Sequence, residues 1–150
     1  MTSKKTKRIL RILYFVSIAL IISGIIILMT TNAKEMFTTM KSDEINTSKD
    51  LDKYTKKYDV VIVKFRVSWC GYCKKLAPIW ERLNKKHDES TLKSGRTVKL
   101  VSLDCDKHKK LAKSHGIQGF PTIKIFKEDR VYEYNDANTF KELDKFIKEL

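Results

Sequence analysis

The sequence predicts an α/β domain in which helices cover both faces of a mixed central sheet, preceded by one transmembrane helix. Two observations predict this class. A continuous apolar run lies near the N-terminus, and beyond residue 50 segments with the period of strands alternate with segments that have the period of helices. Such alternation favours helices packed on both sides of a sheet. The 150 residues suffice for one such domain and its N-terminal extension.

The N-terminal segment has the length of a membrane span. Residues 12–29 are apolar apart from Tyr14, two serines and Gly24, and a helix needs about 20 apolar residues to cross the hydrocarbon core. The run exceeds the apolar core of a cleaved signal peptide, so we favour a retained signal anchor, although residues 31–33 offer a poor cleavage site. A buried helix of a soluble domain would need a polar face, which this run lacks.

Flanking charge predicts how this span is oriented. Residues 1–33 carry five bases and no acid, whereas only Lys34 follows the span closely. Because positive flanks stay in the cytoplasm, we expect residues 1–33 to be a cytoplasmic basic stub with its signal anchor, and the rest to be lumenal or extracytoplasmic. The endoplasmic reticulum is the favoured location, with the periplasm and the exterior as alternatives. All three permit disulfide chemistry.

The basic composition does not predict nucleic-acid binding. The formal net charge is +13, and the chain beyond residue 33 has 26 bases against 18 acids. These lysines are dispersed and often stand beside acids, with no dense basic run interleaved with aromatic residues. Dispersed charge of this kind is typical of a solvated surface.

Residues 34–49 are polar and mixed, and we expect a linker that holds at most a short strand from about residue 44. Within it, Asn46-Thr47-Ser48 matches the acceptor pattern for N-glycosylation. If the domain lies in a eukaryotic secretory lumen, Asn46 is therefore a predicted modification site.

The domain proper is expected over residues 50–150. Residues 60–65 are mostly β-branched and apolar, which is typical of a buried strand. Residues 70–87 have an apolar stripe at helical spacing and contain Pro78, which is expected to kink the helix. A short helix is expected to stop at Gly116. This short helix covers residues 107–115. The other expected elements are helices at 51–57 and 140–150, and strands at 98–103, 122–126 and 130–134.

A Cys-x-x-Cys sequence between a strand and a helix carries the predicted chemistry. Cys70 is expected at the helix start, where unpaired N–H groups and the helix dipole favour the reactive thiolate. Cys73, one turn further, is positioned to attack a mixed disulfide formed at Cys70 and so release the substrate. Gly71 and Tyr72 are expected to tune the redox poise, and Trp69 to offer an apolar contact surface.

A second motif lies far away in the sequence, at residues 119–122 (GFPT) directly before a strand. A proline at the start of a strand cannot donate to the ladder. In this context Pro121 predicts a cis peptide bond that brings the chain close to the dithiol.

These segments resemble those of a known family. The runs 69–78 (WCGYCKKLAP), 101–105 (VSLDC) and 116–124 (GIQGFPTIK) are similar, in order and spacing, to the thioredoxin domains of protein disulfide isomerases. The resemblance covers about residues 44–150 and implies a thioredoxin fold. It also implies that Cys70 is the nucleophile, Cys73 the resolving thiol and Pro121 a cis-proline facing them. Phe120 would present its backbone to an extended substrate.

Two positions depart from the family pattern. Tyr72 stands where these isomerases usually have His, so the redox poise need not follow theirs. Lys64 stands where family members bury an acid beneath the dithiol, and we expect an apolar neighbour around Leu100 on the next strand. One interpretation makes Lys64 a partly neutral proton acceptor for Cys73, because burial lowers the pKa of a lysine. In the other, Lys64 extends to solvent and has no catalytic role.

The predicted function is a membrane-anchored thiol–disulfide oxidoreductase that forms, isomerises or reduces disulfides of protein substrates, with no cofactor, metal or nucleic acid. A dedicated extracytoplasmic thiol reductase for one partner is the main alternative. A non-catalytic client-binding module is less favoured, because such domains usually lose a cysteine. Zinc bound by Cys70, Cys73, Cys105 and His108 is a further alternative, since the spacing suits metal ligands. Cys105 is expected to be a free, partly buried thiol.

Overall fold

The computed structural model describes residues 4–39 and 43–150, which form two units that divide at residue 39. The first unit is the single helix α1 (Lys4–Thr39). Its stretch Lys7–Met29, with a mean hydropathy of 2.8, is the only part of the described chain long and apolar enough to cross a membrane. Helix α1 continues to Thr39, so residues 34–39 of the expected linker are helical, and residues 40–42 of it lie outside the described residues.

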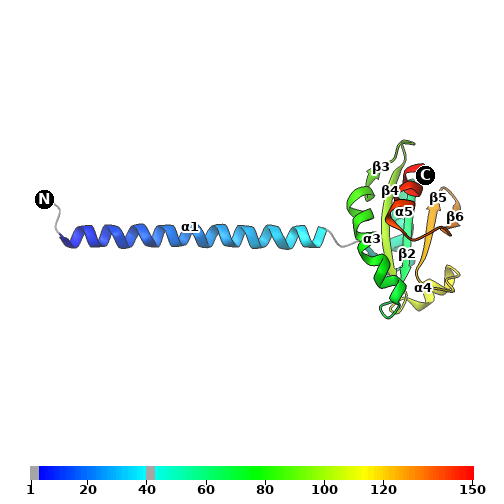
Figure 1. Ribbon diagram of the computed structural model, residues 1–150, viewed down its shortest axis with the longest axis horizontal. Coiled ribbons are helices and arrows are strands. Elements are labelled where there is room, and N and C mark those ends of the chain that lie inside the picture. The colour runs from blue at the N-terminus through cyan, green and yellow to red at the C-terminus, as the bar shows by residue number, and fades with distance from the viewer. Residues whose placement is uncertain (1–3, 40–42) are drawn as a thin grey trace. The chain divides into compact units, whose positions relative to one another are not determined.

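The second unit is built on a mixed sheet with the strand order β1-β4-β2-β5-β6, and β3 pairs with β4 (Figure 1). Strand β4 is parallel to β1 and β2, whereas β5 pairs antiparallel with β2 and β6. The strands are β1 (Asp43–Ile45), β2 (Val60–Arg66), β3 (Ser90–Thr91), β4 (Thr97–Asp104), β5 (Thr122–Lys127) and β6 (Arg130–Glu133). The short strand β3 was not expected from the sequence.

Two apolar cores, one on each face of the sheet, explain why β2 is apolar throughout. Val61, Val63 and Phe65 belong to one buried cluster, and Val60 and Ile62 belong to the other. Alternate residues of a strand point to opposite faces, so a central strand buried on both sides must be apolar on both. The expected architecture of a mixed sheet covered by helices on both faces is confirmed.

The helices begin at residues that cap them well. The helix α2 (Ser48–Lys57) begins with a capping box, in which Thr47 and Asp50 bind each other's backbone N–H groups. Cys70 caps the helix α3 (Gly71–His87), which contains Pro78, and Thr139 caps α5 (Phe140–Glu149). The remaining helix of this unit is α4 (Lys109–Ser114).

A buried lysine ties the strand β1 to the rest of the sheet. Lys99 is 2% exposed, and its Nζ lies 2.7 Å from Asp43, 2.9 Å from Asp88 and 3.0 Å from Glu89. Burial alone would lower the pKa of Lys99, but hydrogen bonds to the three carboxylates outweigh it and raise that pKa. The ammonium therefore holds together three segments that are distant in sequence.

Candidate active site

The topology brings three loops to one edge of the sheet. The parallel strands β2 and β4 end at the same edge, and Cys70 and Asp106 follow them. Strand β5 runs the other way and pairs Thr122 with Phe65 near the end of β2, so Pro121 lies at this edge as well. The sequence motifs around residues 70 and 121 are therefore adjacent in space.

Cys70 occupies the N-cap position of α3, where its thiol meets two backbone groups. The backbone N–H of Cys73 points at Cys70 Sγ, with 3.4 Å between N and S, and this hydrogen bond lowers the pKa of Cys70. In its thiol form, Cys70 donates to the carbonyl oxygen of Phe120 at 3.4 Å. The Phe120–Pro121 peptide bond is cis. The segment before β5 therefore contacts the candidate nucleophile directly.

Cys73 lies one turn further along α3 and differs from Cys70 in its electrostatics. Its side chain is buried, and burial raises the pKa of Cys73 to about 11. The two shifts are opposite, so Cys70 is the thiol of the pair that ionises first and Cys73 is the one that keeps its proton to higher pH. That division is the one a sequential attack requires.

Exposed aromatic side chains surround Cys70. Trp69 is 68% exposed and Tyr72 is 73% exposed, unusually high values for large apolar groups. The Trp69 ring meets the Phe120 ring edge-on, with 6.2 Å between centroids. Trp69 Nε1 also donates to Asp106 at 3.0 Å, which fixes the indole beside the dithiol.

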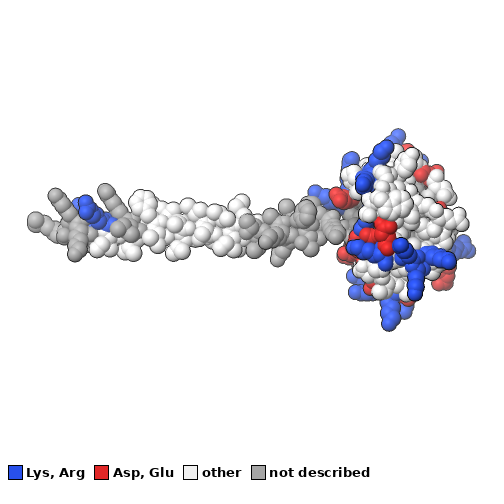
Figure 2. All heavy atoms as spheres, turned by 90° about the horizontal axis from the view of Figure 1, so that it is seen from below, with Lys and Arg blue, Asp and Glu red and all other residues white. Residues whose placement is uncertain are grey.

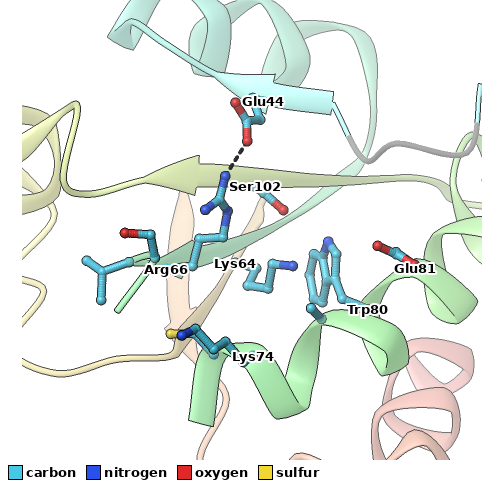
Figure 3. A pocket seen from close by; sticks show the side chains of 11 residues that line it. Glu44, Lys64, Arg66, Lys74, Trp80, Glu81 and Ser102 are labelled. Atoms are coloured by element: carbon cyan, nitrogen blue, oxygen red, sulfur yellow. Dashed lines mark hydrogen bonds and ion pairs between the residues drawn. The ribbon is translucent and has the colours of Figure 1, made fainter. Parts of the chain in front are cut away.

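Lys64 points inward, beneath the dithiol. It is 6% exposed, and its Nζ lies 5.0 Å from the centre of the Trp80 ring (Figure 3). Burial, and after it the nearby charge of Arg66, lower the pKa of Lys64 to about 8. Lys64 and Cys73 line one pocket of about 250 Å³. A lysine that extends to solvent does not fit this burial.

The neighbour of Lys64 on the next strand is not the residue that we expected. The β2–β4 register places Ser102 beside Lys64 and Leu100 beside Ile62. The expectation of an apolar neighbour around Leu100 was therefore wrong by two residues along β4. The other groups of the pocket include Arg66, which pairs with Glu44 on β1 (Figure 3).

The ligand set of the zinc alternative does not assemble. Within the described residues, the only group of three potential ligands that lie within 4.8 Å of one another is Asp43, Asp88 and Glu89, where the Lys99 ammonium lies. No three of Cys70, Cys73, Cys105 and His108 form such a group. Cys105 is buried, and burial raises the pKa of its thiol to about 11.

Comparison with known proteins identifies the family. The family model described as thioredoxin matches residues 41–149, which is most of the chain. The chain belongs to the thioredoxin family. Among solved structures, a form of human ERp44 superposes with a TM-score of 0.64 at 26% identity, covering 73% of this chain and 30% of that one. The first thioredoxin domain of mouse protein disulfide-isomerase A4 superposes with a TM-score of 0.62 at 25% identity, covering 73% of this chain and 77% of that one.

Curated relatives of this thioredoxin-family chain carry disulfide-isomerase names. Protein disulfide isomerase-like 2-1 of Oryza sativa subsp. japonica is 44% identical over 89 residues, 59% of this chain and 22% of the relative. Protein disulfide-isomerase TMX3 of Xenopus laevis is 34% identical over 100 residues, which are 65% of this chain and 21% of that relative. The chain thus spans about one fifth of the length of these relatives.

Sequence reasoning missed the residues that support this thioredoxin-type site from neighbouring strands. Asp106 accepts hydrogen bonds from the backbone N–H and the hydroxyl of Ser68, both at 3.1 Å, besides its bond from Trp69. The signal for Asp106 was its place just after β4, because parallel strands end at a common edge.

Asn46, the predicted glycosylation site, is exposed directly after β1, and its modification stays a prediction.

Proposed function

We propose that the chain is a membrane-anchored thiol–disulfide oxidoreductase whose catalytic dithiol is Cys70 and Cys73. The observation that carries the proposal is the unequal pair at the start of α3. Cys70 has a lowered pKa and touches Phe120, whereas Cys73 is buried with its pKa raised to about 11. The isomerase names of the relatives support the same reaction class.

The reaction proceeds in two exchanges. The Cys70 thiolate attacks one sulfur of a client disulfide, the client S–S bond breaks, and one client thiolate leaves, which forms a mixed disulfide. Cys73 then loses its proton and attacks the sulfur of Cys70, which releases the second client thiolate and forms the Cys70–Cys73 disulfide. Two electrons pass from the dithiol to the client. The reverse sequence oxidises a client dithiol.

Lys64 is the proposed proton acceptor for Cys73. With a pKa of about 8, roughly a tenth of Lys64 side chains are neutral at pH 7. Lys64 and Cys73 line the same pocket, so a water molecule there is able to bridge the amine and the thiol. Lys64 thereby takes the part that a buried acid plays in the resembling proteins.

We further propose that α1 spans a membrane with its basic N-terminal end in the cytoplasm. Its candidate span, Lys7–Met29, is 23 residues long, and all five bases of the first 33 residues lie at or before Arg11, at its N-terminal end. Such an arrangement directs the thioredoxin domain to the opposite side, where disulfides persist. The endoplasmic reticulum is the proposed compartment.

Trapping the mixed disulfide tests the catalytic assignment. Cys73→Ala is expected to accumulate a covalent complex with a disulfide-containing peptide, visible on a non-reducing gel and cleaved by dithiothreitol. Cys70→Ala and the Cys70→Ala/Cys73→Ala double variant are the matched controls and should form none. A complex that forms equally well in Cys70→Ala would rule out Cys70 as the nucleophile.

The proton-transfer role is tested separately, in the resolving step. The rate of resolution of a preformed mixed disulfide is expected to rise between pH 7 and 9 as Lys64 loses its proton. Lys64→Met should lack this rise, and Lys64→Glu should move it to lower pH because a carboxylate replaces the amine. If Lys64→Met keeps the parent's pH profile, the proton-acceptor role is wrong.

A further inference from the structure

The positive charge of the thioredoxin domain is concentrated around its dithiol. Residues 66–75 and 104–113, which follow or end the central strands β2 and β4 at this edge of the sheet, carry seven bases and two acids. The remainder of residues 43–150 carries 17 bases and 15 acids, which is nearly balanced. The dispersed appearance of the lysines in the sequence therefore conceals a local surplus in the folded domain.

The two acids of residues 66–75 and 104–113 are Asp104 and Asp106, and both already have hydrogen-bond or ion-pair partners. Asp106 accepts hydrogen bonds from Ser68 and Trp69. Asp104 is buried, and its Oδ2 lies 3.5 Å from Arg66 and 4.0 Å from Lys107. They leave most of the local lysine charge without a neutralising partner.

Five lysines at this end are exposed and form no ion pair with any residue that the structure describes. We name these five the active-site lysines; they are Lys74, Lys75, Lys109, Lys110 and Lys113. Figure 2 views the domain from the end where α3 begins and α4 lies; basic side chains extend outward around this face, and a group of acidic side chains lies among them.

Two of the active-site lysines, Lys75 and Lys109, stand close to the exposed aromatic groups on the two sides of Cys70. Lys75 Nζ lies 5.6 Å from the centre of the Tyr72 ring on α3. On the other side, Asp106 binds Trp69, and Lys109 is near enough to Asp106 to contribute to the lowered pKa of that carboxyl, after the larger effect of the Ser68 N–H. A client that reaches Cys70 therefore approaches between two groups of lysines.

We propose that the active-site lysines select client polypeptides that carry acidic residues next to the reactive cysteine. The inference rests on the proposed oxidoreductase function and adds a substrate class to it. Charges interact over about 8 Å at physiological ionic strength, which reaches the residues flanking a cysteine bound at Cys70. A surface of one sign raises the association rate of an oppositely charged partner.

A charge-reversal pair on α4 provides the test, in the full chain in a non-ionic detergent. Lys109→Glu/Lys110→Glu changes the first turn of α4, where acids suit the helix dipole. The matched control is Lys85→Glu/Lys93→Glu, which alters two exposed lysines near the opposite end of α3 and before β4. Three disulfide peptides with acidic, neutral or basic flanks serve as substrates, and the rate of attack by Cys70 is measured at 20 and 300 mM salt.

The parent chain is expected to attack the acidic peptide ~10-fold faster than the basic one at low salt, with the preference shrinking at high salt. Lys109→Glu/Lys110→Glu should remove most of this preference, measured as the ratio of the rates on the acidic and basic peptides, whereas the control pair should keep that ratio. Equal rates for the three peptides in the parent chain would overturn the inference and leave the oxidoreductase function standing. Absence of attack on every peptide would refute that function itself.

A membrane surface is another anionic partner that fits this face on charge alone, and the same variants distinguish it from an acidic client. Binding of the thioredoxin domain of the parent chain to the vesicle surface is compared between vesicles that contain 30% phosphatidylserine and vesicles of phosphatidylcholine only. The inference predicts that Lys109→Glu/Lys110→Glu changes peptide preference without changing vesicle binding. Loss of vesicle binding with unchanged peptide preference would assign the active-site lysines to lipid and overturn the inference.

Discussion

Replacing Lys64 with methionine is expected to stabilise the domain at neutral pH. In the unfolded chain the pKa of Lys64 is 10.5, and burial lowers it to about 8 in the folded domain. At about 1.4 kcal/mol per pH unit, this difference makes the folded state about 3 kcal/mol less stable at pH 7 than it would be without the desolvated charge. Lys64→Met, which keeps the apolar stem, should therefore gain about 3 kcal/mol.

The pH dependence of the free energy of unfolding tests the direction of this pKa shift. Between pH 8 and 10.5 the unfolded state binds more protons at Lys64 than the folded state, so the parent's stability rises with pH in that window. The gain from Lys64→Met should accordingly be full below pH 8 and vanish towards pH 10.5. Trp69 and Trp80 are the only tryptophans, so urea unfolding of the full chain in non-ionic detergent can be followed by their fluorescence.

Comparison of the variant with the parent at each pH removes the contributions of the cysteines, because the two proteins share them. Lys93→Met, at an exposed site, is the matched control and should change stability little at any pH. A Lys64→Met variant that is less stable than the parent at pH 7, or a difference that stays constant up to pH 10.5, would refute a desolvated Lys64.

Three further predictions concern other buried groups. Lys99→Met should destabilise the domain by about 3 kcal/mol in urea unfolding, because three carboxylates lose the cation between them; an unchanged midpoint would contradict this. Although burial opposes it, hydrogen bonds from Lys148, Lys86 and His87 hold the pKa of Asp144 well below its usual range, so Asp144→Asn should lose about 1–2 kcal/mol at pH 7. That loss should shrink as pH falls below 4, since the parent's advantage is complete above the unfolded pKa and disappears as pH falls towards the lower folded pKa. In alkylation at pH 7 read by mass spectrometry, Cys70 should react fast and Cys105 should stay unmodified, since burial raises the pKa of Cys105 to about 11; equal labelling would contradict both assignments.

The sequence was sufficient for the order of the elements and for the dithiol, because these depend on local patterns. The apolar run that became β2 and the Cys70-x-x-Cys73 spacing each fix a structure within a few residues. The contact between Cys70 and Phe120 joins two motifs 50 residues apart, which were linked by the proline before the strand and by the resemblance to a family.

Features that depend on strand register or on tertiary contacts were not predictable from the pattern. A shift of two residues along β4 decides whether Leu100 or Ser102 lies beside Lys64, and no local signal fixes it. His87 had no partner identifiable in the sequence, yet its Nε2 lies 2.6 Å from Asp144 on α5. His115 lies between Phe65 and Phe126 from two different strands. Such partners are determined by packing rather than by spacing.

The central claim is a reversible redox pair at Cys70 and Cys73, and a titration of the full chain against glutathione tests it most directly. We predict one two-electron transition, with a disulfide that joins Cys70 to Cys73 and with Cys105 reduced throughout. A midpoint near about −180 mV would agree with an oxidising or isomerising role, and one near about −270 mV with a reductase. Failure to form the Cys70–Cys73 disulfide at any glutathione poise would contradict the redox function.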